Sequence, residues 1–224
     1  RRDFFPQYKS NRKKGREEDG RNWDAIFEVL NKIKSEIKEN LPYKFLEVYG
    51  AEADDIIATL CKLTQTEKDR SKNEKVMIVS GDKDFIQLQK YINVKQYSPI
   101  LKKFVNGSNP ETYIKEHILK GDTGDGVPNV LSPDNTFTDG LRQRPLGKKK
   151  IETWLDMNID DFQDEVKRNY QRNEKLIDLS KIPEELENEI LTDFRGAPHG
   201  DRSKLLNYFI KSRLKNLTET IGEF

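Results

Sequence analysis

The chain has 224 residues, of which 34% are hydrophobic and 35% are charged. The apolar residues fall in periodic clusters, so we expect one large or two small globular domains and exclude a chain that is disordered throughout. Forty Lys and Arg residues nearly balance 39 Asp and Glu residues. The formal charge of +1 gives no global attraction to nucleic acid, so any such binding must come from local patches.

The sequence contains no apolar run of membrane-spanning length and no signal peptide. Cys61 is its single cysteine, which excludes an internal disulfide and suits a reducing compartment. We expect the Cys61 thiol on the buried face of a helix. These features predict a cytoplasmic protein.

Residues 1–21 are densely basic and carry interleaved aromatic residues. One interpretation is a solvated arm. The other is a segment that binds nucleic acid, because Lys and Arg neutralise phosphates and aromatic rings stack on bases. The segment by itself leaves both open. Its basic and aromatic side chains include Arg1, Arg2, Tyr8, Lys9, Arg12 and Lys13.

An amphipathic helix is predicted over 23–39, where apolar residues recur at spacings of three and four. Asn22 is its expected N-cap, and Pro42 ends it. We expect its apolar stripe to be part of the core. A short strand is predicted next, over 45–49.

Three acidic residues, Glu52, Asp54 and Asp55, open the following predicted helix, which runs to about residue 64. Acids in a first helical turn complement the helix dipole, and that alone explains many such clusters. Three acids within four residues exceed this need, and Glu52 and Asp55 share one face of the turn. We therefore favour a role as metal ligands.

The apolar run 76–79 is followed by a turn that presents Asp82 and Asp84. Such a run, bounded by turn residues, predicts a buried strand of a parallel sheet. Ligand sites in open α/β sheets lie just past the carboxyl ends of such strands. Two acids at that position need a positive partner, and a divalent cation is the obvious one. A short helix over 85–90, a strand over 94–97 and a β excursion at 104–105 are predicted next.

A helix is predicted to begin at Asn109-Pro110 and to end at about residue 120. His117 lies within it and has no second His or Cys at ligand spacing, so we expect a packing or surface role. The Gly/Asp-rich turn that follows carries Asp122 and Asp125 three residues apart. Its backbone amides, including those near Gly124 and Gly126, could approach a phosphate closely, although an ordinary Asp/Gly turn is the simpler interpretation.

A helix with a basic start is predicted after Gly147, at Lys148, Lys149 and Lys150. Basic residues at a helix N-terminus oppose the helix dipole, so we expect an anion there. A turn, a linker and a Gly-Lys-Lys helix suit a helix–hairpin–helix element that holds duplex backbone without reading bases. Three further amphipathic helices, over 160–179, 183–194 and 202–214, predict a helical C-terminal region. His199, in a turn, is isolated and is expected to be solvated rather than catalytic.

Seven acids therefore form three groups, each after a strand or in a turn. An all-carboxylate, oxygen-rich site selects Mg²⁺ or Mn²⁺, and the sequence has no Cys/His cluster for zinc. Two ions fit so many ligands better than one, and a two-ion site suits phosphodiester hydrolysis. The candidate metal ligands are Glu52, Asp54, Asp55, Asp82, Asp84, Asp122 and Asp125.

Three motifs, in this order and spacing, resemble the structure-specific 5′ nucleases, a family of flap endonucleases and polymerase-associated 5′→3′ exonucleases. They are Glu-Ala-Asp-Asp at 52–55, Ser-Gly-Asp-Lys-Asp-Phe at 80–85 and Gly-Asp-Thr-Gly-Asp-Gly-Val-Pro-Asn-Val at 121–130. The first twelve residues and the end of the chain are similar to the RNase H group of T-even bacteriophages. The resemblance covers essentially the whole chain. It implies a PIN-like α/β parallel-sheet core, an arch over the active site formed by 11–19, a helix–hairpin–helix element and a helical C-terminal region.

The resemblance also implies an activity, namely metal-dependent removal of RNA primers and 5′ flaps from branched duplex DNA and RNA·DNA hybrids during lagging-strand replication. The seven acids match the family's metal-binding acids. Lys9 and Arg12 match its contacts to the scissile phosphate, and with Asp54 and Asp82 they form the expected catalytic set. A sliding clamp and a single-strand-binding protein are the implied partners of a monomeric enzyme, in the host cytoplasm if a phage encodes it.

One departure from the family pattern is important. The family begins with two strands that each carry an acid, and this chain begins after them. We therefore hypothesise a truncated nuclease that is inactive as it stands, with a nuclease core over 1–120 and a DNA-binding region over 121–224. Two alternatives stay open: a non-catalytic duplex-binding remnant, and a PIN-type ribonuclease, which would not need a duplex clamp.

Overall fold

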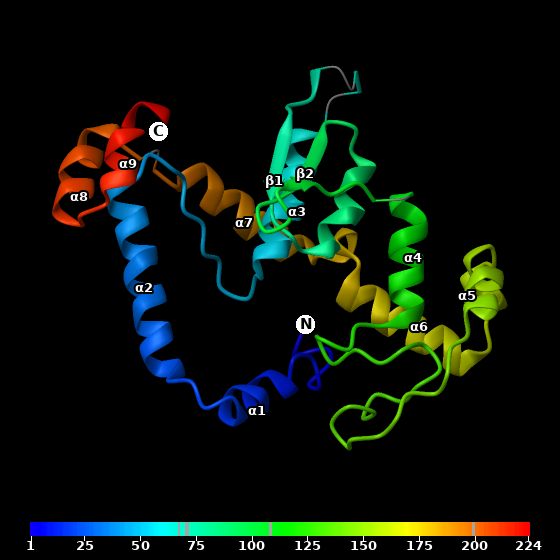
Figure 1. Cartoon of the computed structure of the whole chain (residues 1–224). Helices are drawn as coiled ribbons and strands as arrows, with labels where there is room; N and C mark the ends of the chain where they lie inside the picture. Colours follow the sequence, from blue (N-terminus) through cyan, green and yellow to red (C-terminus); the bar gives the residue numbers. More distant parts are fainter. Residues whose placement is uncertain (67, 70–71, 108, 199) are drawn as a thin grey trace.

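The computed structural model describes residues 1–66, 68–69, 72–107, 109–198 and 200–224. It is a mixed α/β fold that is mainly helical around a small sheet (Figure 1). The main elements, in chain order, are α1 (Asn11–Glu18), α2 (Trp23–Asn40), α3 (Ala53–Thr64), β1 (Val76–Val79), the 3₁₀ helix η2 (Lys83–Lys90), β2 (Val94–Ser98), β3 (Lys103–Phe104), α4 (Pro110–Lys120), α5 (Lys148–Leu155), α6 (Asp164–Ile177), α7 (Glu184–Gly196), α8 (Leu205–Lys211) and α9 (Lys215–Glu219).

The sheet has the order β1-β2-β3. β1 pairs in parallel with β2, with Val76 opposite Val94, and β2 pairs antiparallel with β3. The parallel strand predicted from the sequence is therefore confirmed, but its burial on both faces is not. Ile78 is buried, whereas Met77 and Val79 are 50% and 65% exposed, because β1 is an edge strand in the described structure and one of its faces is uncovered there.

Two hydrophobic cores hold the chain together. The first surrounds the sheet and joins α3, β1, η2 and β2. The second joins the N-terminal segment, α4, α5 and α6. Gln87 connects them, because its amide donates to the carbonyl of Ile177 (3.2 Å) and accepts from the N–H of Leu179 (2.8 Å). This link fixes the end of α6 against η2, so the two cores act as one frame for the residues between them.

α2 differs from its expected role. Its bounds and its Asn22 N-cap match the prediction, since the Asn22 side chain accepts from the N–H of Ala25 (3.1 Å). None of its residues is buried, however, and Phe27 and Leu30 are more than 40% exposed, so the expectation that its stripe is core is wrong for the described structure. α2 contacts other elements mainly near its C-terminal end, where α8 and α9 lie beside it (Figure 1).

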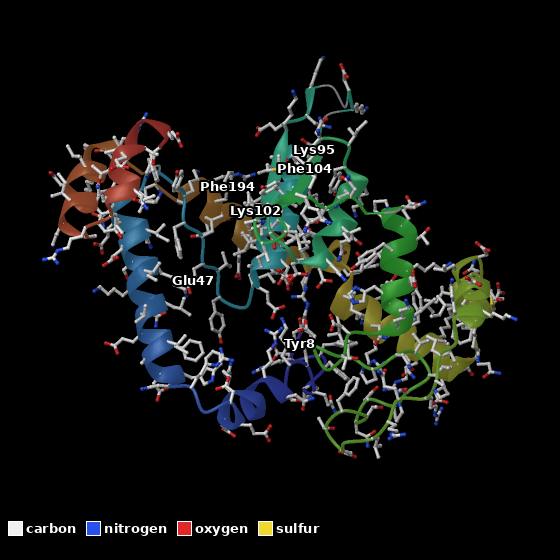
Figure 2. The ribbon with its side chains drawn as sticks, in the orientation of Figure 1. Tyr8, Glu47, Lys95, Lys102, Phe104 and Phe194 are labelled. Carbon is white, nitrogen blue, oxygen red and sulfur yellow. The ribbon has the colours of Figure 1, made fainter. Side chains whose placement is uncertain are left out.

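The predicted strand over 45–49 is also wrong. The segment is extended, but no described strand pairs with it. Side chains hold its surroundings instead: Lys44 donates to the carbonyl of Phe194 (2.6 Å), and Lys34 of α2 pairs with Glu47. Figure 2 shows Glu47 and Phe194 in the region between α2 and the sheet.

Most other predicted helices are present. α4 begins as expected, because Asn109 accepts from the N–H of Glu111 (2.9 Å) and Pro110 occupies the first turn. The helix predicted over 202–214 is instead a 3₁₀ turn, Arg202–Lys204, followed by α8, and α9 was not predicted. Cys61 is buried in α3, as expected, and burial raises the pKa of its thiol to about 11. Among the helices described, none has the length and apolar character needed to cross a membrane.

Candidate active site

A cleft of about 650 Å³ lies between the end of β1, the start of α3, α4 and the turn that follows α4. Acids from three separate segments of the chain line it: Asp54, Asp82, Asp84, Asp122 and Asp125. Lys9 and Arg12 line the same cleft. The fold therefore brings five of the seven predicted metal ligands and all four predicted catalytic residues to one place.

The end of β1 is held rigidly. The Asp82 carboxylate caps η2 by accepting from the N–H of Asp84 (3.0 Å). The buried amide of Gln96, on β2, donates to the carbonyls of Ser80 (2.9 Å) and Asp82 (2.6 Å). Because the turn is fixed from both sides, Asp82 and Asp84 stay at the mouth of the cleft without a ligand present.

The carboxylates in the cleft repel one another. Burial raises the pKa of Asp54, and the negative charges of Asp82 and Glu52 add to that increase. Burial also raises the pKa of Asp84 to about 6, against the attraction of His117 and with further repulsion from Asp82. Like charges in a partly buried site favour a bound cation, because the cation removes the cost of keeping both carboxylates ionised.

The turn after α4 is closed on itself. Asp122 and Val127 exchange backbone hydrogen bonds of 2.8 and 2.7 Å, and Asp122 Oδ1 accepts from the N–H of Asp125 (3.1 Å). The N–H of Gly126 donates to the carbonyl of Thr123 (3.2 Å). These N–H groups therefore donate to acceptors within the turn. The N–H of Gly126 does not face outward toward a phosphate, contrary to the expectation.

His117 lies in the cleft. This differs from the packing or surface role that was predicted for it. Its Nδ1 is 3.5 Å from Asp84 Oδ1 and its Nε2 is 3.6 Å from Asp122 Oδ2. Burial alone lowers the pKa of His117, but the bond toward Asp122 and the charge of Asp84 outweigh burial and raise it. The sequence does contain a signal for this location. His117 lies in the last turn of α4, only five residues before Asp122, so the two residues could be expected in the same cleft.

Glu52 and Asp55 do not line the cleft. The Arg1 guanidinium forms a two-bond contact with the buried Asp55 carboxylate (2.7 and 2.9 Å) and also donates to Glu52 (3.1 Å). Lys9 Nζ lies 2.5 Å from Glu52. In this structure these acids hold the N-terminal segment in place, and their role as metal ligands stays a prediction. The same contacts engage the Arg1 guanidinium, whose predicted role in binding nucleic acid also stays a prediction.

The segment 8–12 is attached to the turn after α4. The buried Tyr8 hydroxyl is 2.8 Å from Glu52 Oε2 and 3.0 Å from Asp125 Oδ2 (Tyr8 is labelled in Figure 2). The backbone N–H of Lys9 donates to the carbonyl of Asp125 (2.7 Å), and Arg12 donates to the Asp125 carboxylate (2.6 Å). Burial raises the pKa of Tyr8, so the phenol stays neutral and can donate to these carboxylates.

Of the other predicted nucleic-acid contacts, Gly124 alone lines the cleft among the residues that the structure describes. Arg2 is exposed beside Tyr8 and Glu52, and the expected arch is the helix α1. The side chain of Lys13 and the residue His199 lie outside the described part of the structure. Lys148, Lys149 and Lys150 are exposed at the start of α5, which Figure 1 places on the far side of α4 and α6 from the N-terminus. Gly124 lines the cleft in the closed turn.

Comparisons with known proteins cover both halves of the chain. The family model of the 5'-3' exonuclease N-terminal resolvase-like domain matches residues 1–119, and that of the T4 RNase H C-terminal domain matches residues 107–224. The ribonuclease H of Enterobacteria phage T4 is 35% identical over an alignment of 237 positions, gaps included, which covers 100% of this chain and 74% of that protein. A 5'-3' exonuclease of Buchnera aphidicola is 33% identical over 138 residues, covering 58% of this chain and 43% of that one.

Solved structures share the fold. A structure of the phage T5 flap endonuclease with metal ions has a TM-score of 0.65 at 18% identity and covers 87% of this chain and 80% of that one. A complex of the T5 enzyme with DNA and metal ions gives the same TM-score and identity. With the cleft and the family matches together, the chain belongs to the 5'-3' exonuclease family, with the C-terminal domain of the phage T4 RNase H type.

Proposed function

We propose that this protein hydrolyses phosphodiester bonds at the 5′ ends and flaps of branched duplex DNA and RNA·DNA hybrids, with the help of divalent metal ions. The observation that carries the proposal is the convergence of five carboxylates from three separate segments on one cleft that also holds Lys9 and Arg12. An acidic site repels a nucleic acid unless metal ions and basic side chains offset its charge, and the cleft provides places for both.

The residues of the cleft fit the metal. Carboxylate oxygens are the ligands that Mg²⁺ and Mn²⁺ prefer, and the raised pKa values of Asp54 and Asp84 indicate charge that a cation would stabilise. We propose that Asp54, Asp82, Asp84, Asp122 and Asp125 hold two Mg²⁺ ions, for which Mn²⁺ can substitute. Bound ions of this kind supply an activated water and stabilise the charge that develops on the phosphate.

Lys9 and Arg12 are suited to position the substrate. Both contact the Asp125 carboxylate, at 3.4 Å from Lys9 Nζ and 2.6 Å from Arg12 Nη2. The positive φ of Lys9 (55°) and its backbone bond to Asp125 fix the direction of its side chain. A metal ion bound to Asp125 would displace the Lys9 and Arg12 side chains from this carboxylate. Both side chains could then contact the scissile phosphate.

The names of two relatives support a biological setting. The T4 relative is named a ribonuclease H and the T5 neighbour a flap endonuclease, and we extend both activities to this chain as removal of RNA primers during lagging-strand replication. A sliding clamp and a single-strand-binding protein remain the expected partners of a monomeric enzyme in the cytoplasm.

A cleavage assay tests the activity. The 224-residue chain is incubated with 5′-labelled flap DNA and Mg²⁺, and the products are separated by size. Because five carboxylates already meet in the cleft, we expect Mg²⁺-dependent cleavage at the branch, against the hypothesis that the chain is inactive as it stands. We expect a loss on the order of 10³-fold in the Asp82→Asn variant because a ligand charge is removed. Asp156→Asn, at an exposed acid after α5, is the matched control and should cleave normally. Undiminished cleavage by the Asp82→Asn variant would contradict the assignment of the cleft as the active site.

A non-catalytic duplex binder is the second candidate. It is favoured by the contacts of Arg1 and Lys9, which occupy Glu52 and Asp55 and so remove two of the seven expected ligands. This alternative gives a distinct result in the same assay: the chain binds flap DNA equally well with Mg²⁺ or with EDTA and never cuts it. Binding without cleavage at saturating Mg²⁺ would select it over the nuclease.

A further inference from the structure

His117 has a buried ring nitrogen that the proposed all-carboxylate site does not use. Its Nδ1 is one of two buried side-chain polar atoms in the described residues that have no hydrogen-bond partner. Buried polar nitrogens are rarely left without a partner, so this atom calls for an explanation. It lies 3.5 Å from Asp84 Oδ1, on the wall of the cleft.

The neighbours of His117 have the composition of a metal site. Ligand atoms of Asp84, His117 and Asp122 lie within 4.8 Å of one another. Nε2 of His117 faces Asp122 Oδ2 at 3.6 Å. A carboxylate that faces one ring nitrogen favours the proton there and leaves the lone pair of the other nitrogen free, which resembles the arrangement around a histidine that binds a metal.

We infer that His117 is a nitrogen ligand in the metal site: Nδ1 binds a divalent ion together with the Asp84 carboxylate, while the charge of the Asp122 carboxylate, 3.6 Å from Nε2, favours the proton on that nitrogen. The inference rests on the proposed function, because it concerns one of the ions that the cleft would hold. It assigns a mixed nitrogen–oxygen ligand set to this ion in place of the all-carboxylate set expected from the sequence.

A protonated His117 that acts as an internal cation is the competing explanation. A charged imidazole between two carboxylates forms hydrogen bonds of about 2.7–2.9 Å. The observed separations of 3.5 and 3.6 Å are too long for such bonds on either side. A separation of 3.5 Å is instead one that an ion bound to both Nδ1 and Asp84 Oδ1 would bridge.

A nitrogen ligand changes which metals the site prefers. Mg²⁺ is a hard ion that favours oxygen, whereas imidazole nitrogen suits first-row transition ions such as Mn²⁺ and Co²⁺. We therefore expect this protein to bind Mn²⁺ more tightly than Mg²⁺ by a margin that depends on His117. The preference would come from the imidazole nitrogen of His117 and not from the surrounding carboxylates.

Pulsed electron paramagnetic resonance tests the bond directly. The 224-residue chain is loaded with Mn²⁺, and echo modulation from nitrogen nuclei at the ion is recorded. We expect ¹⁴N modulation that changes to the ¹⁵N pattern when only histidine is ¹⁵N-labelled, which requires no mutation. The chain has two histidines, so His199→Gln is the matched control and should keep the signal, while His117→Gln should lose it. Bound Mn²⁺ without nitrogen modulation in the unmutated chain would overturn the inference.

Metal titrations separate the inference from the proposed function. If His117 is a ligand, His117→Gln weakens Mn²⁺ binding by about tenfold or more and changes Mg²⁺ binding by less than about threefold. If His117 is an internal cation, the same variant binds both ions more tightly, because a competing positive charge is gone, and the inference fails. Retained Mn²⁺ binding and flap cleavage in that case leave the proposed function intact. A chain that binds no Mn²⁺ at all overturns both.

Discussion

Asp84 lies in the proposed metal site, and its ionised carboxylate lowers the stability of the metal-free fold. Burial raises the pKa of its carboxyl to about 6, above the ordinary value of 3.8. The folded chain therefore binds more protons than the unfolded chain between these two pH values, and the free energy of unfolding falls as pH rises through that range. Above about pH 6 the ionised carboxylate destabilises the metal-free fold, and below about pH 4 this effect is absent.

We therefore expect Asp84→Asn to stabilise the metal-free protein near neutral pH. One pKa unit corresponds to about 1.4 kcal/mol, so the gain is on the order of 1–3 kcal/mol, which raises Tm by several degrees in a chain of this size. Thermal unfolding in EDTA, followed by circular dichroism at about pH 7.5 and about pH 4, measures it; the gain should shrink at the lower pH. Asp156→Asn is the control. A lower Tm for Asp84→Asn near pH 7.5 would contradict the inference that the ionised Asp84 carboxylate destabilises the metal-free fold.

The turn after α4 depends on the backbone freedom of one glycine. Gly121 has φ of +67°, and a Cβ there would lie 2.4 Å from the carbonyl oxygen of Val127. That carbonyl accepts the Asp122 N–H that closes the turn. A side chain at Gly121 therefore meets rigid backbone in addition to the strain of positive φ, and it would displace both acids of the turn.

Gly140 offers a matched comparison. Its φ is +66°, but a Cβ there would have no atom within 4 Å. We expect Gly140→Ala to cost only the conformational strain, about 1–2 kcal/mol, and to leave cleavage unchanged. Gly121→Ala should cost clearly more and should reduce cleavage as well, because Asp122 moves. Urea unfolding and the flap assay on both variants check this; equal effects would show that strain alone governs the turn.

Sequence reasoning located the elements whose signals are local. The apolar run at 76–79, the Asn109-Pro110 helix start and the acids after β1 all have physical causes within a few residues, and the structure has each of them. The three acidic motifs could also be placed in one cleft, because parallel strand ends and helix starts meet at one edge of a sheet.

The misplaced features depend on partners distant in the chain. The periodicity of α2 fixes which face is apolar but says nothing about what covers it, and the described structure leaves Leu30 47% exposed. The sequence predicts Asp55 as a metal ligand but could not show that the fold places Arg1 against it. His117 looked isolated because its two carboxylate neighbours come from different elements.

Two charged groups lie apart in the molecule. Five acids line the cleft, while three exposed lysines lie at the start of α5, which Figure 1 places on the far side of α4 and α6 from the N-terminus. A near-neutral net charge is thus compatible with local patches of either sign. We propose that the cleft acts on the 5′ end while α5 holds the duplex beside it.

If the lysines of α5 hold the duplex, they should contribute to the salt dependence of binding to flap DNA. Each phosphate neutralised by a lysine adds about 0.9 to the steepness of log K against log salt concentration, whatever the DNA sequence. The double variant Lys148→Ala, Lys149→Ala should therefore weaken binding to flap DNA and reduce the slope by about one to two units. Fluorescence anisotropy in EDTA over about 50–200 mM KCl measures the slope without cleavage. The control is Lys32→Ala, Lys215→Ala, which removes two lysines that are 75% and 84% exposed on α2 and α9 and should leave the slope unchanged. If both double variants reduce the slope equally, binding reflects only the total positive charge, and α5 is not the duplex contact.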